Sequence, residues 1–238
     1  NNVLYLDVEA IQDFAECDEA LGQVRSPEFQ ARLKTLRDAD LVDYAGVAEI
    51  KLPMIQRCYA YFRKRHLGPG TQRAQAFRAY QRAHAPALGR HALYEALQEH
   101  FHREDAQVWG WPVWPEAYRD PTAPEVSRFA QSDIERVEFY EYLQWQAELQ
   151  LEAVGRRSME LGLGVGLYQD LAVSIDRGGA EAWANQALYA LAASVGAPPD
   201  AFTLSGQDWG LPPLVPERLR AAAYAPFIAT LRANMRHA

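Results

Sequence analysis

The chain has 238 residues, of which 49% are hydrophobic, and its formal net charge at pH 7 is −7. A chain of this length and composition can bury a substantial core and is expected to be globular. Because an acidic surface lacks the basic excess that neutralises phosphates, we expect no nucleic-acid partner and no attachment to an anionic membrane.

Cysteine content and hydropathy indicate the compartment. The sequence contains two cysteines, Cys17 and Cys58, which are too few for a disulfide framework and form no Cys-x-x-Cys pair. No run of about 18 apolar residues is present, and residues 1–10 carry neither a basic start nor an apolar signal core. We therefore predict a cytoplasmic protein.

The N-terminal residues indicate a chain that begins within a fold. There is no initiating Met, and Asn1-Asn2 leads at once into the strand-like run Val3-Leu4-Tyr5-Leu6. We expect the sequence to be a fragment of a larger protein.

Residues 26–161 are dominated by helical patterns. The first predicted helix begins at Ser26-Pro27, a capping residue followed by a proline suited to the first helical position, and ends near residues 44–46. A second predicted helix spans about residues 47–66 and ends at the breaker Gly68-Pro69-Gly70.

Two further helices precede an irregular segment. Thr71 is expected to cap a helix that runs to about His84, and Pro86 to open one that runs to about Phe101. Residues 109–124 are so rich in proline and tryptophan that they cannot form a regular element. We predict a loop that is held in place by buried rings.

A long helix is predicted after this loop. Ser132-Asp133-Ile134-Glu135 matches a capping box, in which the Ser hydroxyl and the Glu carboxylate each bind a free backbone N–H, and the helix should run to Leu161-Gly162. Its expected buried stripe consists of Phe139, Tyr142, Leu143, Gln146, Leu149 and Val154.

The pattern changes after Gly162. Residues 163–175 are short, apolar and compatible with a buried strand that ends in a glycine turn. Residues 180–192 indicate short helical pieces, 196–216 a proline-rich loop, and 216–236 a final helix. A long helix followed by a buried strand is typical of an α/β fold, either a βα barrel or a doubly wound sheet.

Asp170 is the best single candidate acid, because ligands of parallel α/β folds bind where strands end and loops begin. A carboxylate that caps a nearby turn is the simpler interpretation of its position. Tyr168 would point to the same face of the strand and can hydrogen-bond to a ligand or stack on it. The alternative is a core tyrosine whose hydroxyl is satisfied.

The loop that contains Gly206-Gln207-Asp208-Trp209-Gly210 has the residue types of a carbohydrate platform. Trp209 and Phe202 can stack on the C–H faces of a sugar, Gln207 and Asp208 can bind hydroxyls, and Gly206 and Gly210 permit close approach of the backbone. A tryptophan that only anchors the loop from beneath is an equal alternative.

No metal site is expected. His84, His91, His100 and His102 lie near several carboxylates, but their spacing does not bring two ligands to one helical face at i and i+4. The sequence also contains no phosphate-binding Gly-x-x-x-x-Gly-Lys-[Ser/Thr] loop, no Gly-x-Ser-x-Gly elbow and no evident Ser/His/Asp set.

Several short sequence segments, here called phrases, together resemble segments of the 4-α-glucanotransferases. These enzymes are also called amylomaltases or disproportionating enzymes and belong to the α-amylase-like barrel group. The phrases occur in the family's order and at its approximate spacing along the whole chain. The phrases are Asn2-Val3-Leu4-Tyr5-Leu6-Asp7-Val8-Glu9-Ala10, Tyr142-Leu143-Gln144-Trp145, Asp170-Leu171-Ala172-Val173, Ala182-Trp183-Ala184-Asn185, Gly196-Ala197-Pro198-Pro199-Asp200 and Gly206-Gln207-Asp208-Trp209-Gly210-Leu211-Pro212-Pro213.

The resemblance implies an α/β fold: an incomplete (β/α)8 TIM-barrel segment that is predominantly helical and carries a helical insertion. We expect residues 1–131 to form the helical insertion subdomain and residues 132–238 the partial barrel, with an acceptor-side loop at 196–216. An incomplete barrel exposes strand edges and an apolar face, so self-association is an expected consequence.

The implied activity is transfer of α-1,4-glucan units between maltodextrins, without a cofactor, by a retaining double displacement. In that mechanism one carboxylate is the nucleophile and a second acts as acid and then base. The resemblance places both outside this chain, the nucleophile shortly beyond Ala238, so residues 1–238 contain no catalytic residue and are expected to be inactive alone. The implied substrate-binding residues are Tyr168, Asp170, Phe202, Gln207, Trp209 and Gly210.

One alternative remains at this stage. The chain can be a non-catalytic helical module that binds glucan or a protein partner through Trp209 and the aromatic loop at 109–118.

Overall fold

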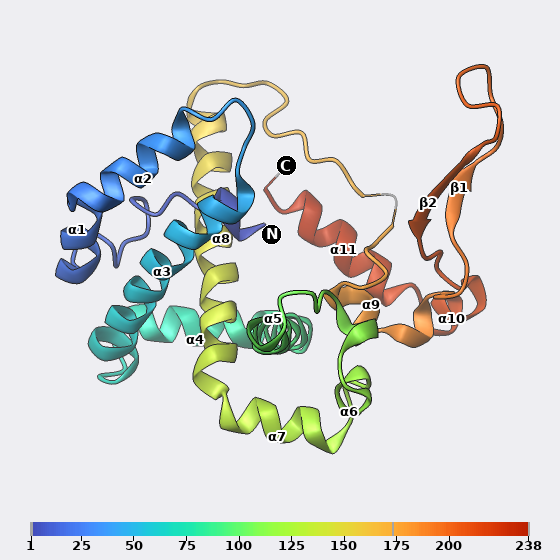
Figure 1. The fold of residues 1–238 in the computed structure, drawn as a ribbon, viewed down its shortest axis with the longest axis horizontal. Coiled ribbons are helices and arrows are strands. Elements are labelled where there is room, and N and C mark those ends of the chain that lie inside the picture. Colours follow the sequence, from blue (N-terminus) through green and yellow to red (C-terminus); the bar gives the residue numbers. More distant parts are fainter. Residues whose placement is uncertain (1, 173, 238) are drawn as a thin grey trace. The chain divides into compact units, whose positions relative to one another are not determined.

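The computed structural model describes residues 2–172 and 174–237. Most of the described residues are helical, and the only sheet among them is a two-stranded hairpin (Figure 1). The elements in chain order are η1 (Val3–Tyr5), α1 (Asp18–Val24), α2 (Pro27–Arg37), α3 (Tyr44–Phe62), η2 (Arg63–Leu67), α4 (Gln72–His84), α5 (Ala87–Glu104), η3 (Trp111–Val113), α6 (Glu116–Arg119), α7 (Pro124–Ser132), α8 (Ile134–Glu160), α9 (Ala180–Ala184), η4 (Gln186–Leu188), β1 (Val195–Ala197), β2 (Gln207–Leu211), α10 (Pro216–Ala221) and α11 (Ala225–Met235).

The chain divides by its internal contacts into two compact units. Unit 1 consists of Asn1–Leu88 and Glu138–Val154, and unit 2 of Gly89–Val137 and Gly155–Ala238. This division does not follow the boundary expected between residues 131 and 132, because α8 contributes its middle to unit 1 and both of its ends to unit 2. The assignment of an insertion and a barrel segment to either side of residue 131 stays a prediction.

The core of unit 1 is built from aromatic rings on α3, α4 and α8. Tyr59 and Phe62 of α3 lie with their ring centroids 5.3 and 5.2 Å from that of Tyr142 on α8. Phe77 of α4 packs edge-on against Phe62 at 5.5 Å. Tilted and edge-on pairs of this kind add about 0.5–1.5 kcal/mol to the hydrophobic burial of the rings. Most of the buried stripe predicted for α8 is confirmed, since Phe139, Tyr142, Leu143 and Gln146 are all buried, but Val154 is exposed.

An ion pair is buried in the same unit. Asp13 is 1% exposed, and its carboxylate accepts hydrogen bonds from the guanidinium of Arg73 and, at 2.7 Å, from the hydroxyl of Tyr142. The guanidinium of Arg73 also lies over the ring of Trp145, 4.9 Å from its centroid. Because both oxygens of this carboxylate accept hydrogen bonds, its charge can be held away from water.

The core of unit 2 contains one tryptophan from the proline-rich segment, Trp114, and one from α9, Trp183. Trp114 and Trp183 are fully buried, with ring centroids 5.8 Å apart. The indole N–H of Trp114 donates to Oε1 of Gln98 at 3.2 Å, and that of Trp183 donates to the carbonyl of Tyr118 at 3.0 Å. The prediction of a loop pinned by buried rings is therefore confirmed, although the segment also contains the short turns η3 and α6.

Several helix ends follow the expected capping chemistry. The side chain of Ser26 accepts from the backbone N–H of Phe29 at 3.2 Å, and that of Thr71 from Ala74 at 3.4 Å. The first helix nevertheless ends at Arg37, well before residues 44–46, because Asp43 caps the next helix by accepting from the N–H of Gly46 at 2.8 Å. Residues 63–67, expected to complete that helix, form a π-helical turn.

The predicted capping box at residues 132–135 is wrong. Ser132 is the last residue of α7, and its hydroxyl donates to the carbonyl of Phe129 and to Asp133. Helix α8 begins immediately afterwards at Ile134, with no side-chain cap. The pattern failed because two helices abut at this point. Ser132 is still part of α7, so Asp133 and not Ser132 occupies the N-cap position of α8.

Two strand predictions are also wrong. Val3–Tyr5 forms a 3-10 turn, and the side-chain oxygen of Asn2 accepts from the backbone N–H of Leu4 at 3.0 Å. Residues 163–172, 174 and 175 contain no strand; Val173 lies outside the described residues. A buried strand needs neighbouring strands for its N–H and C=O groups, and the described part of the chain places none beside this segment.

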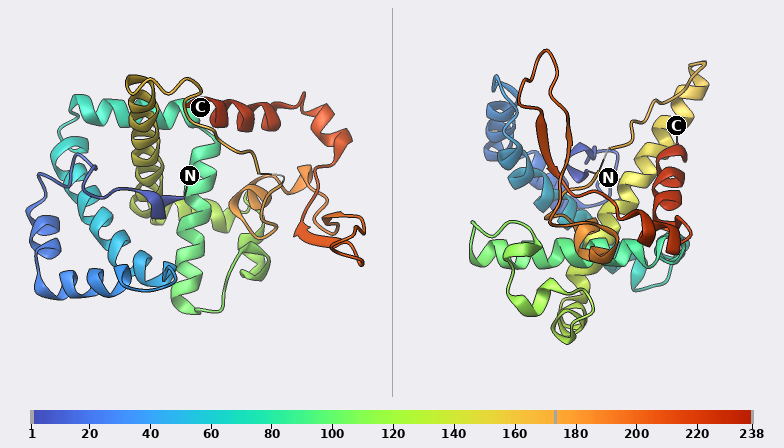
Figure 2. Two further views of the ribbon diagram at one scale, coloured as in Figure 1. Left: turned by 90° about the horizontal axis from the view of Figure 1, so that it is seen from above. Right: turned by 90° about the vertical axis from the view of Figure 1, so that its right-hand side faces the viewer.

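The loop predicted at 196–216 contains the β1–β2 hairpin, which extends from the region of α9 and α10 as a twisted ribbon (Figures 1 and 2). Its prolines fall in the turn and after Leu211, so they do not interrupt the paired residues 207–211. The single helix predicted at 216–236 is likewise divided, because Ala223 and Tyr224 adopt positive φ angles of 49° and 59° between α10 and α11.

Candidate functional site

Trp209 lies in a bulge of the hairpin. Val195 pairs with Leu211 and Gly196 pairs with Asp208, so Trp209 and Gly210 are extra residues on β2 between two consecutive pairs of β1. Gly210 has φ +69°, a left-handed conformation that favours glycine. Bulges of this kind bend a strand and redirect its side chains. The orientation of Trp209 is therefore set by the pairing register.

The indole of Trp209 is held by its neighbour in β2. Its N–H donates to Oε1 of Gln207 at 2.9 Å, while 42% of the residue is exposed to solvent. Since the N–H already has an acceptor within the strand, the ring can offer its apolar surface without leaving a polar group unsatisfied. Gln207, Trp209 and Gly210 thus lie together in β2, and the role of Trp209 as a sugar platform stays a prediction.

Asp208 is engaged within the hairpin. Its Oδ1 accepts hydrogen bonds from the hydroxyl of Ser194 and, at 2.9 Å, from the backbone N–H of Gly210. These bonds, the one from Ser194 first, lower the pKa of Asp208 from its ordinary value because they favour the charged form. Sequence reasoning offered Asp208 as a contact for sugar hydroxyls; in the structure it fastens the bulge.

Replacing Ser194 by Ala should raise the pKa of Asp208 toward its ordinary value, because the variant lacks the larger of the two hydrogen bonds that favour the carboxylate. A carboxyl with a lowered folded pKa stabilises the fold above its unfolded pKa, and this contribution disappears as the pH falls through the folded pKa. Carboxyl carbon NMR, followed during an acid titration of the native chain and of Ser194→Ala, measures the change. Identical titration curves would contradict the assignment.

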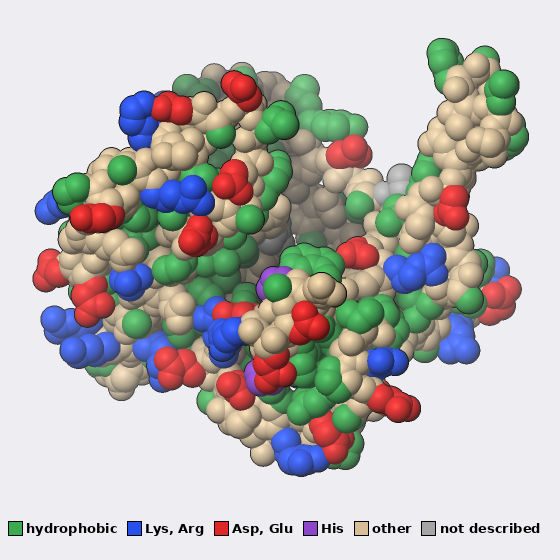
Figure 3. Space-filling model, in the orientation of Figure 1, with side chains coloured by type: hydrophobic (Ala, Val, Ile, Leu, Met, Phe, Trp, Pro, Cys, Tyr) green, Lys and Arg blue, Asp and Glu red, His purple; other side chains and the backbone are tan. Residues whose placement is uncertain are grey.

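Phe202 lies at the tip of the hairpin and is 98% exposed. The tip turn is closed by Asp200, whose Oδ1 accepts from the backbone N–H groups of Phe202 at 2.8 Å and Thr203 at 2.6 Å. Leu204 is also exposed, and Figure 3 shows hydrophobic side chains gathered at this tip. The tip therefore presents an apolar surface that is separate from Trp209, which lies further along the chain in β2.

Tyr168 and Asp170 lie on the segment that lacks regular structure. Tyr168 is 88% exposed and Asp170 is exposed. The same segment is tied to the end of β2 by Ser174, whose hydroxyl donates to the carbonyl of Pro212 at 2.7 Å. The two side chains are accessible, but they are not grouped with Trp209 by any contact between described residues.

Arg177 is a residue of this region that sequence reasoning missed. Its guanidinium donates to the carbonyl of Ala193 at 2.8 Å and to the carbonyl of Gly210 at 3.2 Å. The only sequence signal was its place in a glycine turn, which says nothing of partners 16 and 33 residues away.

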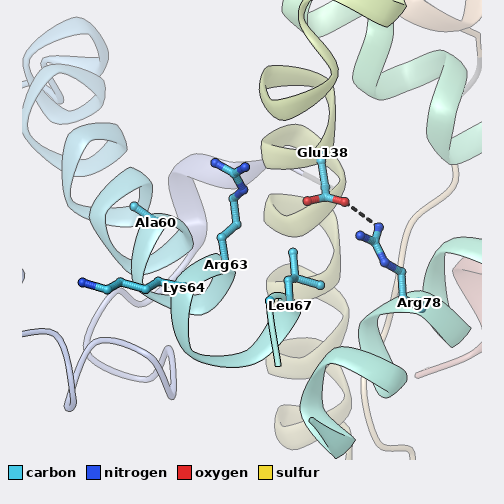
Figure 4. Close-up of a pocket in the computed structure, with 7 residues that line it drawn as sticks. Ala60, Arg63, Lys64, Leu67, Arg78 and Glu138 are labelled. Atoms are coloured by element: carbon cyan, nitrogen blue, oxygen red, sulfur yellow. Dashed lines mark hydrogen bonds and ion pairs between the residues drawn. The ribbon is translucent and has the colours of Figure 1, made fainter. Parts of the chain in front are cut away.

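Unit 1 has an open concave site of about 390 Å³ beside the π-helical turn, lined in part by Arg63, Lys64, Arg78 and Glu138. Figure 4 shows Arg78 directed at Glu138, with which it forms an ion pair of 2.5 Å, while Lys64 points away from that pair. The cations do not converge on one point, so the pocket has no evident anion site.

Across 2–172 and 174–237, no group of three or more His, Cys, Asp or Glu side chains is arranged to hold a metal ion. No helix in that part of the chain is both long and apolar enough to cross a bilayer.

The chain matches the model of one protein family over its whole length. The family is described as 4-alpha-glucanotransferase, and the match covers residues 1–238. Among curated proteins, the chain is 33% identical over 239 residues to the 4-alpha-glucanotransferase of Haemophilus influenzae, covering 99% of this chain and 34% of that protein. It is 34% identical over 244 residues to the 4-alpha-glucanotransferase of Mycobacterium tuberculosis, covering 100% of this chain and 31% of that protein.

Solved structures agree with these matches. The structure is similar to amylomaltase from Corynebacterium glutamicum, with a TM-score of 0.76 and 29% identity, over 100% of this chain and 30% of that one. It has the same TM-score and 18% identity with amylomaltase from Streptococcus agalactiae in complex with acarbose, over 99% of this chain and 45% of that one. The chain spans about a third of the length of the curated relatives that it matches.

Proposed function

This chain belongs to the 4-alpha-glucanotransferase family, and we propose that it is the substrate-positioning part of an enzyme that transfers α-1,4-glucan units between maltodextrins. The observation that supports this role most directly is the geometry of Trp209. Its ring is partly exposed, its N–H is satisfied by Gln207, and its direction is fixed by a bulge. A fixed aromatic surface of this kind suits the C–H face of a sugar.

The proposed contacts follow from this arrangement. Trp209 stacks on a glucose unit on the acceptor side, Gln207 binds a neighbouring hydroxyl, and the backbone of Gly210 allows the chain to approach closely. Tyr168 and Phe202 add aromatic surface, and the carboxylate of Asp170 binds sugar hydroxyls. The proposed ligands are α-1,4-glucans and maltodextrins, and no cofactor takes part.

Bond cleavage is assigned to residues outside 1–238. A retaining double displacement needs two carboxyl groups about 5 Å apart, one as nucleophile and one as acid and then base. The proposal places both on segments of a (β/α)8 barrel to which this chain contributes a part, in a cytoplasmic enzyme. Residues 1–238 alone would then hold a glucan without transferring it, and their incomplete barrel would favour self-association.

The Trp209→Ala variant tests the sugar platform. We expect maltoheptaose to quench the tryptophan fluorescence of the native chain, and the variant to lose most of this quenching together with about tenfold in affinity, as expected for an aromatic contact worth about 1.4 kcal/mol. The matched control is Trp109→Ala, because Trp109 is also exposed, at 72%, but lies outside the hairpin. Equal quenching in the native chain and in Trp209→Ala would refute the platform.

Activity tests the wider assignment. A polypeptide extended at both ends to the length of the relatives should disproportionate maltotriose and release glucose, whereas residues 1–238 should not. An extended, folded polypeptide without transferase activity would overturn the assignment to an active enzyme. Transfer by residues 1–238 alone would overturn the placement of the catalytic carboxylates.

A further inference from the structure

We propose that Arg177 is a positioning residue that holds the bulge of β2 and thereby directs Trp209. The proposal deepens the function proposed above and rests on it for the sugar-binding consequence. It concerns a residue that does not itself touch the glucan, and the support for it comes from two sets of contacts that meet at Arg177.

The first set fixes the backbone of Arg177 to the buried core of unit 2. The carbonyl of Arg177 accepts from the indole N–H of Trp111 at 3.0 Å. The next carbonyl, that of Gly178, accepts from the hydroxyl of Tyr94 at 2.6 Å and from the backbone N–H of Trp111 at 3.3 Å. Two consecutive carbonyl groups are thus bonded to the buried Tyr94 and the half-buried Trp111, so the turn has little freedom to move.

The approach of this turn to the core is also close. Gly110 has φ +85°, and a Cβ atom at that position would lie 3.1 Å from the carbonyl oxygen of Gly178. Asp176 closes the turn by accepting from the N–H of Gly178 at 2.9 Å. The backbone position of Arg177 is therefore fixed by contacts of the residues on both sides of it.

The second set of contacts joins the side chain to the hairpin. The guanidinium donates to the carbonyl of Ala193, just before β1, and to the carbonyl of Gly210 in β2, at 2.8 and 3.2 Å. Planar guanidinium groups present several donors in a fixed arrangement, so one side chain can bind two carbonyls and fix their separation. Arg177 therefore joins the segment just before β1 to the bulge of β2.

With these contacts, both backbone polar groups of Gly210 are hydrogen-bonded. Its N–H is bound by Asp208 and its carbonyl by Arg177. Gly210 directly follows Trp209 and adopts the left-handed conformation that makes the bulge possible. With both polar groups of this residue held, the rotation of the chain at Trp209 is restricted, and the ring keeps one direction relative to the core of unit 2.

The variants Arg177→Met and Arg177→Lys test the proposal. Met retains the length and apolar part of the side chain without its donors, whereas Lys retains the charge but cannot present the planar pair of donors. The control is Arg128→Met, which removes an exposed arginine of α7 whose ion pair with Glu125 lies within one helix. Far-UV circular dichroism establishes that each variant is folded, and Arg177→Lys serves if Arg177→Met is not.

Amide hydrogen exchange of residues 193–211 is the readout that does not depend on glucan. We expect exchange about tenfold faster in Arg177→Met, an intermediate increase in Arg177→Lys and no change in Arg128→Met, because only the first loses both bonds to the hairpin. Unchanged exchange in Arg177→Met would overturn the inference, whatever the chain does with sugars.

The affinity for maltoheptaose, measured on the same variants, separates the two proposals. One result would be faster exchange together with an affinity reduced about fivefold in Arg177→Met and restored in part in Arg177→Lys. This result supports both the positioning role of Arg177 and the sugar platform. Faster exchange with unchanged affinity supports the positioning role of Arg177 and contradicts the role of Trp209 in the proposed function.

Discussion

Replacing Arg73 by Met should lower the free energy of unfolding of this chain by about 3–5 kcal/mol. Asp13 is 1% exposed, and Arg73 is the cation that binds both of its carboxylate oxygens. Without the guanidinium, Tyr142 still donates one hydrogen bond and Nε2 of His66 lies 3.7 Å from Oδ1, but the buried charge loses the cation that bonds both of its oxygens. The variant also loses the stacking of the guanidinium on Trp145. Urea titration followed by far-UV circular dichroism measures the effect.

A double variant separates the buried charge from the lost packing. Asp13→Asn removes the charge while the amide oxygen can still accept from Tyr142. If the unpaired carboxylate causes most of the loss, Arg73→Met with Asp13→Asn should be more stable than Arg73→Met alone by about 1–3 kcal/mol. A double variant less stable than either single one would show that the ion pair contributes little and that packing accounts for the effect.

Replacing Trp114 by Ala should destabilise unit 2 by about 3–5 kcal/mol, because a fully buried indole is removed and a cavity remains. The ring lies with its centroid 5.1 Å from that of Tyr94 and 5.8 Å from that of Trp183, so neither neighbour can fill the space without moving. Urea titration again measures the loss, now with hydrogen exchange of residues 89–137 as the local readout.

Trp109→Ala is the matched control for this prediction. Both tryptophans lie in the same proline-rich segment, but Trp109 is 72% exposed, so its removal should change the free energy of unfolding by no more than about 0.5 kcal/mol. Since Tyr94 also holds the turn that carries Arg177, we further expect Trp114→Ala to accelerate exchange in the β1–β2 hairpin. Equal stability of the two variants would contradict the central role assigned to Trp114.

Helices with local start signals could be predicted from the sequence. Ser26 and Thr71 cap the helices that follow them because the bond between a cap and its helix joins residues three positions apart. The capping box at Ser132 failed because Ser132 is the last residue of the preceding helix, which leaves Asp133 at the N-cap position of α8. Local chemistry predicts that a cap can form, and the neighbouring helix decides whether it does.

The strands could not be predicted in the same way. Residues 163–172 have the composition of a buried strand, yet they form none because strand structure depends on partners elsewhere in the chain. Residues 207–211 form a strand within a segment predicted to be a loop, since Val195–Ala197 supplies their backbone partners. Composition recognises apolar and proline-rich runs, but it does not identify which runs will pair.

The sequence by itself determined the family resemblance, the helical character of residues 26–161 and the candidate role of Trp209, because these depend on residue identity and short spacing. The tertiary structure decided how that tryptophan is presented. The register of β1 against β2 produces the bulge, and the contacts of Arg177 with residues 16 and 33 positions away hold it. Helix and strand periodicity in a sequence reports local structure and does not indicate which distant segments will meet. These contacts are therefore seen only in the folded structure.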